Sequence, residues 1–166
     1  MNQTTLETVS KKLNVPAAWL SALINFESAG NPAARNKITG ARGLIQFMPA
    51  TARAMGFRDA DEIVKKYPTF ESQLQTPVYN YLKKYAPFPT KQSLFMAVFY
   101  PAARTWETTT FFPAIVRKQN PGIDTVQDYI NYVEGRPPLK FKPVSIVAAA
   151  ILAALGYLIY KTIKPT

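Results

Sequence analysis

The chain has 166 residues, carries a formal net charge of +10 and contains neither histidine nor cysteine. These absences exclude histidine catalysis, thiol nucleophiles, disulfides and metal sites built from His or Cys. Apolar residues make up 48% of the chain and aromatic residues 13%, which is enough for one domain with a hydrophobic core. The positive charge favours anionic surroundings, but no basic run is interleaved with aromatic side chains, so we expect no nucleic-acid partner.

Helical periodicity extends over the first 135 residues. Leu6, Val9 and Leu13 recur at helical spacing and predict a first helix, with Thr4 or Thr5 as its N-cap. The pattern predicts a second helix that is capped by Asn14, has Pro16 in its first turn and runs to about Ser28. Further helices are predicted from Pro49 to Gly56 and over residues 59–66, 70–85, 90–100 and 124–134. No stretch alternates with a period of two, so the fold class expected for residues 1–135 is all-α.

A carboxylate lies on the apolar stripe of the second helix. Glu27 shares that stripe with Leu20, Leu23 and Ile24, where an unpaired charge would be costly to bury. Such a residue is more often a paired structural charge than a catalyst. A catalytic acid, however, needs desolvation of this kind, because burial raises a carboxyl pKa and keeps the proton in place at neutral pH.

The segment after this helix is rich in chain breakers. Gly30 and Pro32 end the helix, and Gly40 and Gly43 allow positive φ angles or a close approach of the backbone. Gln46 is then the single polar residue in the run from Leu44 to Met48. A buried amide must be satisfied, so Gln46 is either a core amide bonded to backbone or a group that a substrate satisfies in a cleft.

Taken together and in this order, the motifs "ESAGNP" and "GARGLIQFMPATA" resemble the signature of the soluble lytic transglycosylase (SLT) family, which shares a lysozyme-like fold with goose-type lysozymes. The resemblance implies an all-α, lysozyme-like (SLT/goose-type) helical domain. The residues that fit the signature are Glu27, Ser28, Asn31, Pro32, Gly43, Leu44, Gln46, Met48, Pro49, Thr51 and Ala52.

The resemblance continues more loosely to about residue 134. The segment "TPVYNYLKKY" resembles the long helix that follows in the family, and "QDYINYV" resembles its closing Glu-Thr-x-x-Tyr-Val element. In "VFYPAA", Tyr100 and Ala102 fit the family's Ala-Tyr-Asn-Ala-Gly motif. Pro101 stands where the family has Asn, and Ala103 where it has Gly, which changes the backbone next to the tyrosine.

The resemblance implies cleavage of the β-1,4 bond between N-acetylmuramic acid and N-acetylglucosamine in peptidoglycan, without cofactor or metal. Glu27 would protonate the leaving oxygen and then, as a carboxylate, deprotonate the C6 hydroxyl to give a 1,6-anhydromuramoyl end. By the same analogy Gln46 and Tyr100 would position the sugar or the carboxyl, and Ser28 would support the glutamate. Phe47 and Met48 would offer apolar surface to a sugar, while Asn31, Gly43 and Leu44 would form the supporting loop.

The sequence places no second acid close to Glu27, since the nearest acids are Glu7 and Asp59. Most glycosidases use two carboxylates, and the cluster of residues 59–62 looks instead like a helix N-terminus. Three alternatives stay open: a hydrolytic muramidase of the same fold, a catalytically inactive wall-binding or virion structural module, and a membrane-permeabilising lysis protein.

The C-terminal 31 residues differ from the rest, because residues 136–166 hold five Lys or Arg and no acid. We expect a basic, Pro-rich linker over 136–143, a single transmembrane helix over 144–160 and a short basic tail over 161–166. This pattern predicts a single C-terminal membrane anchor, with the lipid bilayer as a partner. The flanking charges give no clear topology, but the function that the resemblance implies would place the catalytic domain on the side facing the cell wall. Because no signal peptide is visible, one hypothesis for its location is a bacteriophage virion membrane, with virion or membrane-protein partners.

Overall fold

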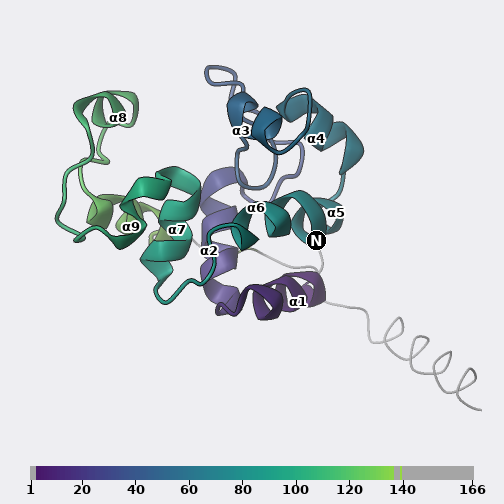
Figure 1. The fold of residues 1–166 in the computed structure, drawn as a ribbon, viewed down its shortest axis with the longest axis horizontal. Coiled ribbons are helices and arrows are strands. Elements are labelled where there is room, and N and C mark those ends of the chain that lie inside the picture. Colours follow the sequence, from purple (N-terminus) through teal and green to yellow (C-terminus); the bar gives the residue numbers. More distant parts are fainter. Residues whose placement is uncertain (1–2, 137–138, 140–166) are drawn as a thin grey trace, which may run out of the picture.

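The computed structural model of the chain describes residues 3–136 and residue 139 (Figure 1). These residues are mostly helical, as predicted, and their extended pairings are isolated bridges such as Arg42 with Phe47. The helices are α1 (Gln3–Leu13), α2 (Ala17–Ser28), α3 (Pro49–Ala54), α4 (Ala60–Lys66), α5 (Phe70–Gln73), α6 (Tyr79–Lys83), α7 (Lys91–Phe99), α8 (Ala114–Gln119) and α9 (Val126–Glu134).

Helix α2 lies at the centre of the molecule (Figure 1). It contacts α1, α7 and α9, and its side chains Leu20, Leu23 and Ile24 are fully buried. The same helix carries Glu27 in its last turn. The predicted apolar stripe is therefore the core face of the domain, and it brings the carboxylate to the end of a helix that packs against the core.

The start signals of the helices were predicted only in part. Residues 59–62 lie at a helix N-terminus as expected, and Asp59 caps α4, because its side chain accepts a hydrogen bond from the backbone N–H of Glu62. Thr4 and Thr5, in contrast, lie inside α1. Asn14 does not cap α2; it has a φ of +54° and lies just after α1, where asparagine tolerates the left-handed conformation. Pro16 occupies the N-cap position of α2 without a side-chain cap.

The segment predicted as one helix over residues 70–85 is divided into three parts. A π-helical turn, Leu74–Val78, separates α5 from α6 and contains Pro77. Proline lacks the backbone N–H of a regular α-helix and its ring crowds the preceding turn, which explains the interruption. A 3-10 turn, Pro101–Thr105, and the short helix α8 were not predicted.

The predicted fold class is wrong in its membrane part. Within residues 3–136 and 139, no helix combines the length and the apolar character that crossing a bilayer requires. The longest described helix, α2, has 12 residues, whereas a span needs about 20. The predicted transmembrane helix over 144–160 lies outside the described residues, as do most of the linker and the tail. The fold class is corrected to a mostly helical domain.

Candidate active site

Glu27 lies in the last turn of α2, immediately before the chain leaves the helix. Ala29 and Gly30 follow with φ angles of +52° and +73°, a left-handed ending that stops the helix and redirects the chain. The side chain of Glu27 is partly exposed, so a ligand can reach it. Burial nevertheless raises its pKa from 4.5 to about 7, and a hydrogen bond from Tyr129 acts in the opposite direction. The carboxyl is thus a candidate proton donor near neutral pH.

Tyr129 is the direct partner of this carboxyl. Its hydroxyl donates a hydrogen bond of 2.7 Å to Oε1 of Glu27. The residue belongs to α9 and is fully buried. Its ring stacks on Phe99 at a centroid distance of 4.2 Å and meets Phe26 edge-on at 5.4 Å. Burial and the nearby charge of Glu27 raise the pKa of Tyr129 well above its usual value, so the hydroxyl keeps its proton and remains a donor.

Tyr129 was not predicted as a site residue. The available signal is the stripe of α9, in which Val126, Tyr129, Ile130 and Val133 are all buried. A tyrosine in such a stripe needs a partner for its hydroxyl. Sequence alone does not reveal that the partner is Glu27, because 102 positions separate the two residues.

Tyr100, the tyrosine predicted as a site residue, packs against other rings than Tyr129 does. It ends α7, and its ring lies 5.6 Å from Trp106 and 5.8 Å from Phe112 between centroids. Pro101, the departure from the family motif, begins the 3-10 turn at a position where a missing N–H is tolerated. The structure therefore brings Tyr129, and not Tyr100, into hydrogen-bond contact with Glu27. A contact between Tyr100 and a sugar stays a prediction.

Ser28 and Asn31 fix the chain as it leaves α2. The Ser28 hydroxyl donates to the carbonyl oxygens of Ile24 at 3.1 Å and Leu44 at 2.9 Å, so it ties the helix end to the far arm of the loop. Asn31 is exposed, and its Oδ1 accepts a hydrogen bond from the N–H of Ala33, which forms a local turn. Both contacts hold the backbone of the loop, and the predicted roles of Ser28 in supporting Glu27 and in substrate binding stay predictions.

Gln46 has an unusual backbone conformation for a residue with a side chain. Its φ is +50°, a region that non-glycine residues rarely adopt and that often marks functional sites. Its Nε2 donates to the carbonyl of Gly43 at 3.0 Å. This contact agrees with the first of the two interpretations, an amide hydrogen-bonded to backbone. The side chain is only half-buried, however, and remains accessible to a ligand.

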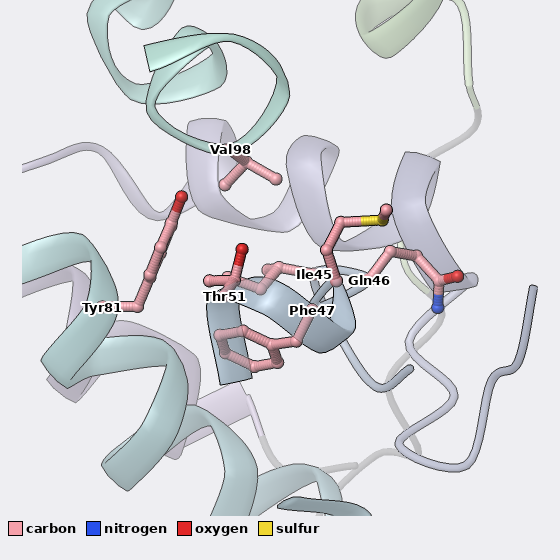
Figure 2. Close-up of a pocket in the computed structure, with 7 residues that line it drawn as sticks. Ile45, Gln46, Phe47, Thr51, Tyr81 and Val98 are labelled. Carbon is pink, nitrogen blue, oxygen red and sulfur yellow. The ribbon is translucent and has the colours of Figure 1, made fainter. Parts of the chain in front are cut away.

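A small hollow of about 30 Å³ lies next to Gln46. Figure 2 shows Ile45, Phe47 and Thr51 grouped below Val98 and to the right of Tyr81, with the Gln46 amide pointing to the right, away from Tyr81. Met48 also lines the hollow and is 44% exposed, whereas Phe47 is only 2% exposed and packs edge-on against Tyr81. The surface predicted for a sugar is thus offered mainly by Met48, while Phe47 supports it from the core.

The acidic cluster after α3 has structural partners. Asp59 caps α4, and Glu62 accepts a hydrogen bond of 2.6 Å from the N–H of Arg58. Asp61 lies 3.1 Å from the Nε of Arg42, which belongs to the loop. Only burial and Tyr129 shift the pKa of Glu27, and no second carboxylate of the described residues contributes. Among all the residues that the structure describes, no group of three or more Asp or Glu side chains is placed to hold a metal ion.

Comparison with known proteins adds one finding on the family. No solved structure matches the chain. Residues 5–81 match the family model of the transglycosylase SLT domain, and this segment includes Glu27, the loop after it and the hollow as far as Tyr81. Tyr129 and Tyr100 lie beyond it, and the match gives no support for a lipid-bilayer or virion partner. Over residues 5–81 the chain is similar to the transglycosylase SLT domain, which supports the SLT, lysozyme-like family and peptidoglycan as the substrate class.

Proposed function

We propose that this protein is a lytic transglycosylase that cleaves the β-1,4 bond between N-acetylmuramic acid and N-acetylglucosamine and leaves 1,6-anhydromuramoyl ends. The observation that carries the proposal is the pair Glu27 and Tyr129, in which a half-buried carboxyl with a pKa raised to about 7 accepts a hydrogen bond of 2.7 Å. The similarity of residues 5–81 to the SLT domain supplies the substrate class.

The first step is protonation of the glycosidic oxygen by Glu27. A general acid must carry its proton when the substrate binds, and a pKa of about 7 leaves it largely protonated below neutral pH. Tyr129 orients the carboxyl through Oε1, so the other oxygen, Oε2, is the one that donates the proton. The N-acetyl group of the muramoyl sugar would stabilise the cationic centre that forms when the bond breaks.

The second step uses the carboxylate that the first step leaves behind. The hydrogen bond from Tyr129 favours this charged form, so the same contact that orients the acid also stabilises the base. The carboxylate removes the proton from the C6 hydroxyl, whose oxygen attacks the anomeric carbon and closes the anhydro ring. This sequence needs a single carboxylate, and the pKa of Glu27 responds to no other described acid.

We also propose Gln46, Met48 and Tyr100 as sugar contacts, with Phe47 and Ser28 behind them. Met48 offers exposed apolar surface beside the hollow, and Gln46 presents a half-buried amide on the same loop. Tyr100 lies in an aromatic cluster with Trp106 and Phe112. Apolar faces and a few oriented polar groups are what a sugar site requires.

The experiment is digestion of purified peptidoglycan, followed by mass spectrometry of the released muropeptides. Wild-type protein should release anhydro ends, and Glu27→Gln should reduce the rate by about 100-fold or more, because general acid catalysis contributes about 10²–10⁴-fold. Glu7→Gln is the matched control, since Glu7 is an exposed acid on α1 that accepts a hydrogen bond from Gln3.

Three results would contradict the proposal in different ways. Reducing ends in place of anhydro ends would make the protein a muramidase, with water attacking instead of the C6 hydroxyl. Equal rates for wild type and Glu27→Gln would refute Glu27 as the acid. Folded wild-type protein that binds peptidoglycan but releases nothing would favour an inactive wall-binding module.

A further inference from the structure

A fully buried glutamine lies behind the loop that follows Glu27. Gln73 is the last residue of α5 and has no exposed surface. Its Oε1 accepts a hydrogen bond of 3.0 Å from the backbone N–H of Leu44, and its Nε2 donates one of 2.7 Å to the carbonyl of Pro32. Both ends of the amide are therefore used, and both partners are backbone groups of the loop.

The two partners belong to opposite arms of that loop. Pro32 lies five positions after Glu27, and Leu44 lies two positions before Gln46. The arms also bond to each other directly, since the N–H of Gly43 donates to the carbonyl of Ala34 at 3.0 Å. The amide of Gln73 spans them from the core side and fixes the arm with Gln46 relative to the arm that continues from the acid.

The peptide groups of Leu44 are held on both sides. Its N–H donates to Gln73, and its carbonyl accepts from the hydroxyl of Ser28, the neighbour of Glu27, at 2.9 Å. Two successive hydrogen bonds thus connect the end of α2, through Leu44, to the end of α5. Movement of Gln73 would shift the backbone just before Gln46.

Gly43 makes room for this arrangement. Its φ is +80°, and a Cβ built on it would lie 2.6 Å from Oε1 of Gln73, well inside contact distance. Only glycine allows the amide to approach the loop this closely. The glycine of the motif and the buried glutamine therefore form one structural unit, although 30 positions separate them in the sequence.

We propose that Gln73 is a positioning residue for the reaction. It sets the placement of Gln46 and Met48 relative to Glu27 by clamping the two arms of the loop. This inference rests on the proposed function, because a positioning role requires a reaction. Gln73 has no direct part in the chemistry, since its amide is buried and both of its ends are occupied by backbone groups.

The first test compares Gln73→Met with Ser72→Ala. Methionine keeps the length of the side chain and removes both hydrogen bonds to the loop. Ser72 is the neighbouring residue and forms the capping box of α5 with Thr69, away from the loop. We expect Gln73→Met to lower kcat on peptidoglycan about tenfold at a temperature at which circular dichroism shows it folded. Ser72→Ala should lower the melting temperature and leave kcat unchanged.

The second test is the pH profile of Gln73→Glu. A protonated glutamic acid can donate to the Pro32 carbonyl and accept from the Leu44 N–H, as the amide does, whereas the carboxylate cannot donate. The ratio of its kcat to that of the wild type should rise as the pH falls. This variant also keeps the proposal testable if Gln73→Met does not fold. A ratio that stays constant with pH, or an unchanged kcat in folded Gln73→Met, would overturn the clamp.

Amide hydrogen exchange separates this proposal from the proposed function. The Leu44 N–H should exchange slowly in the wild type and at least tenfold faster in Gln73→Met, whether or not substrate is cleaved. A protected Leu44 amide in a wild type that fails to cleave peptidoglycan would refute the function and not the clamp geometry. If the wild type cleaves peptidoglycan and the Leu44 N–H exchanges at the same rate in wild type and Gln73→Met, the clamp would be refuted and the proposed function would stand.

Discussion

The two parts of the candidate site are built in different ways. The part over residues 27–48 is continuous in sequence, lies inside the segment that matches the SLT domain, and is held by hydrogen bonds to backbone groups. The part contributed by α7 and α9 lies outside that segment and is held by aromatic packing around Tyr129. The difference shows that the acid and its loop form a local motif, whereas the partner of the acid depends on the tertiary fold.

This contrast has consequences for substitutions. The loop is held by hydrogen bonds and by residues with positive φ angles. Removal of one hydrogen-bonding atom, or replacement of a glycine by a residue with a side chain, should therefore disturb its structure. The aromatic part relies on ring volume, so a change that keeps the ring and removes a hydroxyl should leave the packing intact.

The largest expected effect concerns the stability of Glu27→Gln at different pH values. The pKa of Glu27 is about 7 in the folded protein, above the ordinary value of 4.5. The folded state therefore binds the proton more tightly, and the free energy of unfolding of the wild type should fall as the pH rises from 4.5 through 7.

Glutamine carries no proton to lose, so the variant escapes this loss. Its stability relative to wild type should be greater at pH 8 than at pH 4.5 by up to about 3 kcal/mol, at about 1.36 kcal/mol per pKa unit. Urea unfolding of both proteins at the two pH values measures the difference. A gap that is independent of pH would show that Glu27 is not desolvated as the structure indicates.

The next prediction compares two glycines with similar backbone conformations. Gly43 and Gly56 have φ angles of +80° and +88°, but a Cβ on Gly56 would meet nothing within 4 Å. Alanine should therefore cost about 1–2 kcal/mol at Gly56, from backbone strain alone. At Gly43 we expect a further loss of about 1–3 kcal/mol, because the new methyl group would collide with Gln73. Equal losses in thermal unfolding would mean that Gln73 yields without cost.

A smaller effect, of about tenfold in kcat or about 1.4 kcal/mol, is expected for Tyr129→Phe. The ring keeps its packing against Phe26 and Phe99, but Oε1 of Glu27 loses its donor. Because that hydrogen bond lowers the pKa of Glu27, its loss should raise the pKa further. The alkaline limb of the pH–rate profile, along which activity falls as the acid loses its proton, should move to higher pH. An unmoved limb would contradict the role of Tyr129.

The sequence predicted the local part of the site better than the distant part. Glu27 on its apolar stripe, the helix end at Gly30 and the isolated amide Gln46 are all visible from periodicity and chain breakers. The clamp by Gln73 was missed because a glutamine near a proline carries no local signal of burial. Tyr129 was missed because its apolar spacing is equally typical of a core tyrosine, and only the packing of α9 against α2 brings it to the acid.

Some of the predicted N-cap residues were wrong for a physical reason. Thr4, Thr5 and Asn14 are good N-cap residues by type, but a cap also requires the helix to begin at the next position. α1 starts earlier, and Pro16 sets the start of α2. The division of residues 70–85 could have been expected from Pro77, whereas the π-helical form of the turn, which contacts α1, has no signal in the sequence.

The smallest expected effect is that of Tyr100→Phe on the pH profile, and it separates the two tyrosines. The ring contacts of Tyr100 with Trp106 and Phe112 survive loss of the hydroxyl, and no hydrogen bond to Glu27 is lost in the described part of the chain. The variant should therefore leave the alkaline limb in place, within about 0.2 pH units of wild type, in contrast to Tyr129→Phe. If Tyr100 contacts the sugar, as proposed, KM should rise about two- to fivefold, the loss of one hydrogen bond. A shift of the limb as large as that of Tyr129→Phe would mean that the acid is tuned from both tyrosines, and the division between a local motif and a distant aromatic partner would no longer hold.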